Sequence, residues 1–95
     1  MVVNVSVSIR RLVLDVLKPR EVAIVDISKA LCGVDGVEEV DVVVTEVDVK
    51  TETIKLTIKG PNICYDDMAK VLIDYSCAIR SIDEVNVYKH KPEIN

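Results

Sequence analysis

Residues 51–75, TETIKLTIKGPNICYDDMAKVLIDY, decide the fold, because the spacing of their apolar side chains changes once. Up to Lys59 apolar and polar residues alternate, which is the two-residue period of a half-buried strand. After the break at Gly60-Pro61-Asn62, apolar residues recur three or four positions apart, as on one face of a helix. The strand would bury Ile54, Leu56 and Ile58, and the helix would bury Met68, Val71, Leu72 and Tyr75.

The preceding residues predict the same order of strand and helix. Residues 9–17 are strand-like, and Pro19 suits the first turn of a helix over 19–32. Gly33 and Gly36 suit the left-handed conformation at a helix end. Residues 1–8 alternate strictly, so they form an arm that either prolongs the strand or pairs with a neighbouring subunit.

Two further strands complete the pattern. Residues 37–49 change the parity of their valines, and a bulge near Thr45 and Glu46 is the simplest repair. The last strand runs over 79–88 with Val85 and Val87 on its apolar side, and the polar residues 89–95 are expected to fray. The division is therefore an arm at 1–8, one domain at 9–89 and a polar tail at 90–95.

These elements predict an α+β fold, the ferredoxin-like βαββαβ sandwich. It has a four-stranded antiparallel sheet of strand order 4-1-3-2 and two helices on one face. This order brings the end of the first strand, the hairpin between the second and third, and the start of the fourth to one end of the sheet. Acidic residues far apart in sequence are then expected to lie together.

Composition excludes several classes of function. A net charge of −4 argues against binding to nucleic acid, which needs many basic residues. Cys32, Cys64 and Cys77 form no CxxC pair, and the lone His90 falls in the polar tail, so zinc spacing is absent. Without a signal sequence or a membrane-spanning run, we expect a cytoplasmic protein with no membrane partner.

The acidic end suggests a site for a hard divalent cation, calcium or magnesium, which takes oxygen ligands. Such a site would be assembled from separate segments or across subunits, because no contiguous calcium loop is present. The candidate ligands are Asp15, Asp48, Glu52 and Asp83, with Glu46 and Glu84 as second choices.

Two other readings of these acids stay open. Bases at the same end could neutralise them in exposed ion pairs that contribute little to stability. Alternatively, the acids of one subunit could meet bases of another and fix the register of assembly. The first reading involves Lys18, Arg20 and Lys50, and the second involves Arg10, Arg11 or Arg80.

The helix-free face of the sheet is expected to carry apolar side chains. If Leu12, Leu14 and their neighbours face the helices, Val13 and Leu17 face away, as does Val43. A continuous apolar patch indicates an interface, so we expect a homo-oligomer that covers this face or a sheet edge. Scattered surface valines without a role are the alternative.

At this point three stretches carry a resemblance: LVLDVLKP at 12–19, VDVKTETIKLTIKG at 47–60 and SIDEV at 81–85. The chain resembles the archaeal DUF211 family over nearly all of residues 9–88. The resemblance implies a ferredoxin-like fold in a cytoplasmic archaeal protein and a ring-like homo-oligomer. It implies no reaction.

An enzyme is not expected, because no Ser, Cys or Lys has an evident base partner in the sequence. The preferred function is a homo-oligomeric protein that binds a divalent cation. The alternative is a regulatory module that senses a small ligand between subunits, by analogy with domains of similar topology.

Overall fold

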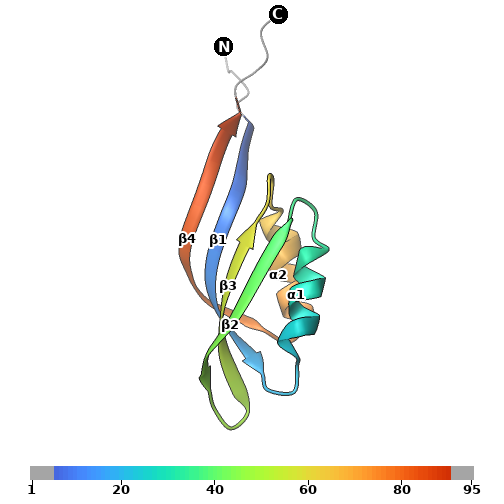
Figure 1. Cartoon of the computed structure of the whole chain (residues 1–95), viewed down its shortest axis with the longest axis vertical. Coiled ribbons are helices and arrows are strands. Elements are labelled where there is room, and N and C mark those ends of the chain that lie inside the picture. Colours follow the sequence, from blue (N-terminus) through green and yellow to red (C-terminus); the bar gives the residue numbers. More distant parts are fainter. Residues whose placement is uncertain (1–5, 91–95) are drawn as a thin grey trace, which may run out of the picture.

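The computed structural model describes residues 6–90, so residues 1–5 of the expected arm and 91–95 of the expected tail lie outside it. Figure 1 shows one sheet with both helices on the same face. The elements in chain order are β1 (Ser6–Pro19), α1 (Ile24–Cys32), β2 (Glu39–Val47), β3 (Thr51–Lys59), α2 (Tyr65–Asp74) and β4 (Ala78–His90).

The strands form one sheet of order β2-β3-β1-β4, and every neighbouring pair is antiparallel. Counted from the β4 edge, the order reads 4-1-3-2. The α+β class, the four-stranded antiparallel sheet and the two helices are therefore confirmed. Pro19 lies opposite Thr51 and Leu17 opposite Ala78, so the end of β1 and the starts of β3 and β4 do meet at one end of the sheet.

The core lies between the sheet and the helices, and aliphatic side chains fill it. The alternation in β1 and β3 is the predicted one, and α2 buries Met68 and Leu72 as expected. Each fully buried aliphatic side chain contributes about 1.5–3 kcal/mol. The strand residues of this core are Leu12, Leu14, Val16, Ile54, Leu56 and Ile58.

The first helix begins later than its sequence predicts. Pro19 is the last residue of β1, and α1 starts only at Ile24, so the prediction of a helix from residue 19 was wrong. The helix ends at Cys32 as expected, but Gly33 has an ordinary φ of −82°. Of these two glycines, Gly36, with φ of +81°, is the one in the left-handed conformation.

The expected bulge in β2 is present. The register with β3 shifts between Val44 and Glu46, which leaves Thr45 unpaired in the ladder. The Thr45 hydroxyl donates a hydrogen bond to the Thr53 carbonyl, 3.2 Å away. Before the bulge the valines at even positions face the helices, and after it the parity reverses, as the sequence indicated.

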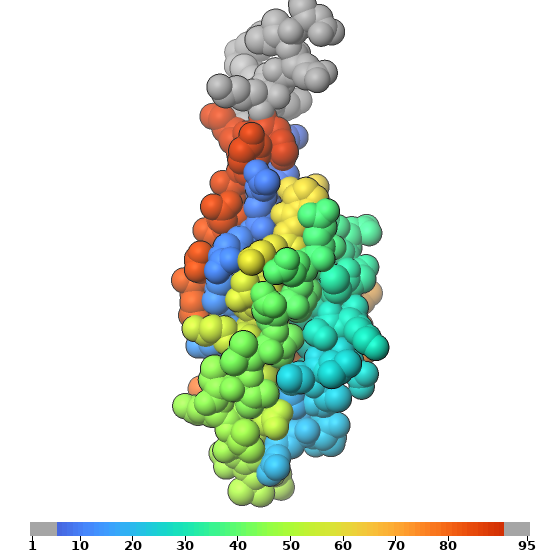
Figure 2. Space-filling model, viewed as in Figure 1, coloured from blue at the N-terminus to red at the C-terminus, as the bar shows by residue number. Residues whose placement is uncertain are grey.

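The outer parts of β1 and β4 form a two-stranded ribbon that extends beyond the helices (Figures 1 and 2). Ser6–Ser8 continue β1 and pair with Tyr88–His90 of β4, so Lys89 and His90 are strand residues and not frayed tail. The molecule measures 58 × 22 × 19 Å, with a radius of gyration of 15.3 Å. A compact chain of this length would have a radius of gyration of about 12 Å.

Candidate functional site

The charged sheet end is built around a buried lysine. Lys18 is 1% exposed and its Nζ lies 2.6 Å from Oε1 of Glu52, its cross-strand neighbour. The ammonium also donates hydrogen bonds to the carbonyls of Pro19 and Val22. These contacts hold the chain between β1 and α1. The reading of Lys18 as one of several exposed, weakly contributing ion-pair partners was therefore wrong.

Two other predicted acids are neutralised on the open face of the sheet. Asp83 accepts a hydrogen bond from Ser81 at 2.8 Å and lies 3.9 Å from the Lys55 ammonium. Glu84 is hydrogen-bonded to Arg11 at 3.0 Å, farther along β4. Together with the Lys59–Glu39 pair, these contacts make the open face more polar than the sequence suggested. Val13, expected to be exposed there, is buried at 7%.

The remaining acids line a hollow on the open face, at the bulges of β2 and β4. Asp15 and Glu46 face one part of it, of about 420 Å³. Glu46 and Asp48 face an adjoining part of about 360 Å³. Arg80 lines both parts, and Thr45, Thr53 and Ser81 add hydroxyl groups.

The structure therefore divides the six predicted ligands. Glu52 lies with Lys18 on the helix side, Asp83 and Glu84 have basic partners on the open face, and only the other three border the hollow. Among residues 6–90 of a single chain, no three His, Cys, Asp or Glu side chains are grouped to hold a metal ion. A cation site would need ligands from more than one chain or a rearrangement of these pairs.

Cys77 lies beside the buried lysine and is 6% exposed. Burial raises the pKa of its thiol above the ordinary value, and the positive charge of Lys18 opposes that rise. The neutral thiol packs in the core and donates a weak hydrogen bond to the Tyr75 carbonyl. Cys77 is thus a structural residue rather than a nucleophile.

The β1–β4 ribbon presents an apolar stripe on its helix-facing side. Val85 lies opposite Leu12 and Val87 opposite Ile9, so both are on the side that the register of core residues predicts. They are nevertheless 49% and 54% exposed, because the helices do not reach over this part of β4 (Figure 1). Val7 is exposed farther out on the ribbon, and Ile82 is exposed on β4 opposite Leu14, within the four-stranded part of the sheet.

The other side of the ribbon holds a polar and aromatic cluster that sequence reasoning missed. Ser8 Oγ and His90 Nε2 are hydrogen-bonded at 2.8 Å, so one serine does have a histidine partner. The Tyr88 ring meets the His90 ring edge-on, and the Arg10 guanidinium lies 4.8 Å from the centre of the Tyr88 ring. The strict alternation of residues 1–8 places Ser6 and Ser8 on one face, but it does not identify His90 as the partner of Ser8.

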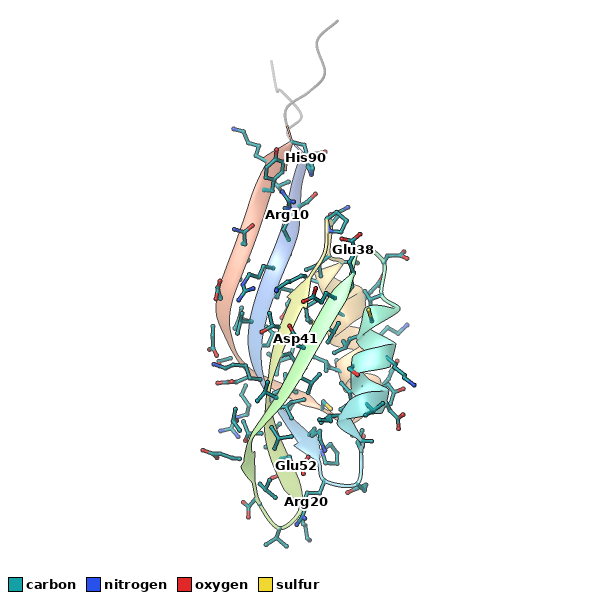
Figure 3. All side chains as sticks on the ribbon, viewed as in Figure 1. Arg10, Arg20, Glu38, Asp41, Glu52 and His90 are labelled. Atoms are coloured by element: carbon teal, nitrogen blue, oxygen red, sulfur yellow. The ribbon has the colours of Figure 1, made fainter. Side chains whose placement is uncertain are left out.

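The opposite edge strand, β2, differs in charge. Residues 34–49 contain acids and no Lys or Arg. Asp41 lies near the middle of β2, while Arg10 lies on the ribbon at the other edge (Figure 3). Among residues 6–90, neither Arg10 nor Asp41 has an ion-pair partner within 4.0 Å.

Within residues 6–90, fold and site together define a small βαββαβ sandwich with an acidic edge strand β2, an edge strand β4 that carries charges of both signs, and a charged hollow on its open face. None of the helices in the described part of the chain has the length and apolar character to cross a membrane.

The chain belongs to the DUF211 family, described as uncharacterized ArCR, which matches residues 10–91. It is similar to an uncharacterized protein of Methanocaldococcus jannaschii. The two are 40% identical over 77 residues, which cover 81% of this chain and 79% of the relative. These relationships confirm the resemblance seen in the sequence, and neither brings an assigned activity.

Proposed function

We propose that this chain is an assembly module that forms a homo-oligomer through its β1–β4 ribbon. The single observation that carries the proposal is the exposed apolar stripe on a ribbon that projects past the helices. A two-stranded ribbon is marginally stable alone in water. β1 has 14 residues and β4 has 13, far more than the usual five or six.

A second copy of the chain is the partner that the charges favour. The chain holds an acidic edge at β2 and basic side chains at the outer part of the ribbon, so one copy offers what another needs. This supports the expectation of a homo-oligomer, ring-like if successive contacts close. The βαββαβ order and strand order also support placing the domain among ferredoxin-like folds, and a cytoplasmic location stays a prediction.

The test compares two exposed valines in native mass spectrometry and light scattering. Val87→Lys puts a charge into the ribbon stripe and is expected to shift the protein to monomer. Val49→Lys, in the hairpin at the far end, is the matched control and should leave the subunit number unchanged. A wild-type protein that stays monomeric at high concentration would end the proposal.

A small ligand in the hollow is a second candidate function. Asp15, Glu46 and Arg80 line the hollow, and among residues 6–90 none of them has an ion-pair partner within 4.0 Å. Charges of both signs suit a ligand that carries both an ammonium and a carboxylate group, such as an amino acid. A regulatory role with the ligand between subunits belongs to the same proposal.

Calorimetric titration with the common amino acids tests this candidate. Binding that disappears in Arg80→Ala but survives in the control Arg11→Ala would support the hollow as the site. Heat changes that are absent for every amino acid at millimolar concentration would dismiss this ligand class.

Binding of calcium or magnesium by Asp15, Asp48, Glu52 and Asp83 also stays a proposal. The ion pairs of Glu52 and Asp83 would have to open, or two chains would have to combine their acids. Native mass spectrometry before and after chelation tests it, because the bound metal adds a defined mass. An oligomer that carries no metal and is unchanged by chelator would retire the cation site while leaving assembly intact.

A further inference from the structure

We propose that β4 of one copy pairs antiparallel with β2 of the next, so that the sheet continues from subunit to subunit. The inference rests on the proposed assembly function and names the part of the second copy that the ribbon meets. The contact is heterologous, because it joins two different edges of identical chains.

Strand direction permits this pairing. In the sheet order β2-β3-β1-β4 every strand is antiparallel to its neighbour, so β2 and β4 run in opposite directions. A second copy in the same orientation therefore places its β2 antiparallel to the first copy's β4. The helices of both copies then lie on the same face of the extended sheet.

Bulges define which parts of the two edges match. In β4 the extra residues relative to β1 are Arg80 and Asp83, so β4 itself has no extra residue from Glu84 to His90; the third shift, at Val87 and Asn86, comes from an extra residue of β1, Arg10. In β2 the bulge is at Thr45, which leaves a regular run from Glu39 to Val44. These two runs have similar lengths, and bulges commonly end strand pairing.

One register satisfies both faces of the extended sheet. Placing Val87 opposite Val42 sets Val85 opposite Val44 on the helix side, so aliphatic residues meet as cross-strand pairs. Because α1 packs against β2, α1 of the next copy would border the exposed stripe, beside its own exposed Val25. The stripe that the ribbon's own helices leave uncovered would be buried.

On the open face, the same register sets Tyr88 opposite Asp41 and His90 opposite Glu39. Arg10 lies over the Tyr88 ring, next to the position that the partner's aspartate would take. The unpaired guanidinium of one copy and the unpaired carboxylate of the next would then form an ion pair. Figure 3 shows Arg10 on β1, next to the edge strand β4, and Asp41 on β2, the opposite edge strand.

The competing arrangement pairs two β4 strands about a two-fold axis at Asn86. It would match Asp83 with Lys89 and Val85 with Val87. It leaves Asp41 without a counterion and the acidic β2 edge uncovered, so the charges favour the β4–β2 contact.

Charge reversal tests the ion pair by native mass spectrometry. Arg10→Glu and Asp41→Arg are each expected to raise the dissociation constant of the oligomer at least tenfold. The double variant, in which the charges are exchanged, should recover most of the affinity. Arg20→Glu, at the far end of the molecule, is the control and should have no effect. Single variants that assemble as tightly as wild type would overturn the inference.

Disulfide trapping tests the register in a background with Cys32→Ser, which removes the exposed native thiol. A chain that carries both Asn86→Cys and Val43→Cys, residues opposite each other in the proposed register, should form covalent multimers of more than two chains on mild oxidation. Asn86→Cys alone should form none. Covalent dimers from Asn86→Cys alone would establish the two-fold arrangement instead.

The two levels of the proposal fail separately. An oligomer that loses subunits in Val87→Lys but gives no β4–β2 crosslink keeps the assembly function and overturns the pairing. A wild-type monomer overturns both.

Discussion

Lys18 is a buried basic side chain at the charged end of the sheet, and its ammonium group contacts Glu52 and two backbone carbonyls. Replacing it with methionine would keep most of the volume but leave Glu52 and two carbonyls without their donor. We expect Lys18→Met to lower the free energy of unfolding by about 3 kcal/mol, the range for breaking a buried pair. Urea denaturation measures this.

The matched control is Lys55→Met, which removes a base from a half-exposed pair with Asp83. Exposed pairs contribute about 1 kcal/mol or less, so this variant should differ little from wild type. Equal losses of unfolding free energy in both variants would show that the buried Lys18–Glu52 pair stabilises the fold no more than the half-exposed Lys55–Asp83 pair does.

Cys77 gives the stability a pH dependence. Because the folded thiol has a raised pKa, its stabilising contribution is complete below the pKa of the unfolded thiol and is lost as pH rises toward the folded value. The unfolded value is about 8.5. We expect the free energy of unfolding to fall as pH rises above that value, and Cys77→Ala to remove most of that fall.

Cys32→Ala is the control for this measurement, since it removes an exposed thiol and should keep the wild-type pH profile. If the unfolding free energy of Cys77→Ala depends on pH as that of the wild type does, another group causes the loss of stability at alkaline pH.

For individual residues, the sequence predicted where charged side chains lie better than it predicted which side chains they contact. It placed charges of both signs at one end of the sheet, yet Lys18 looked like any other surface base. Its partner Glu52 is distant in the chain, and only the β1–β3 register reveals that the two are opposite each other. Burial of a charge depends on such non-local pairs, which residue spacing does not contain.

At the scale of the elements, the loop between α1 and β2 passes very close to the loop between β3 and α2, at Gly36 and Asn62. A Cβ on Gly36 would lie 1.6 Å from the carbonyl oxygen of Asn62, and its φ of +81° disfavours other residues. We expect Gly36→Ala to cost about 2 kcal/mol or more in unfolding free energy. Gly33→Ala, where a Cβ meets nothing closer than 3.4 Å, should be neutral or slightly stabilising in the same denaturation experiment.

A Gly36→Ala variant as stable as Gly33→Ala would mean that the backbone at Asn62 can move away from the added Cβ without a loss of unfolding free energy. The sequence offered both glycines as helix stops without distinguishing them, because it shows no backbone angles. It did locate the bulge, since a parity break in a run of valines has few other solutions.

Helix α1 shows how a local rule loses to tertiary contacts. Proline commonly opens a helix, and that preference predicted a start at Pro19. Here the proline ends β1 instead, opposite Thr51, and the buried Lys18 fixes the next residues by bonding the carbonyls of Pro19 and Val22. Local preference decided where the helix ends but not where it begins.

At the scale of the whole molecule, assembly should protect the backbone amides of the ribbon from hydrogen exchange. If a second copy covers it, the amides of 7–9 and 86–90 should exchange more slowly as protein concentration rises. Amides of β3, in the interior of the sheet, should be independent of concentration. Hydrogen exchange followed by mass spectrometry measures both in one sample.

Val87→Lys is the control here, because it should keep the ribbon unprotected at all concentrations. Ribbon protection that is equal in dilute and concentrated wild-type protein would contradict an interface at this end.

For the molecule as a whole, hydrophobic periodicity was enough to predict the class and the helix layer. It placed the exposed apolar surface on the open face, where the structure exposes Val43 at 57% but buries Val13, and it did not indicate the exposed apolar residues of β4 and the ribbon. The difference arises because ion pairs cover the open face, two of them between neighbouring strands and the Lys55–Asp83 pair across β1, and because two short helices cannot span strands of this length. Neither effect is visible in a single strand's pattern.

The long pairing of β1 with β4 also bears on how the chain is made. β1 leaves the ribosome before every other element of the domain, and β4 leaves after them all. Ser8 meets its hydrogen-bond partner 82 residues later in the chain. The central strand of the sheet therefore keeps one side unpaired throughout synthesis of the domain, and closing it is a late, long-range event of the slow kind.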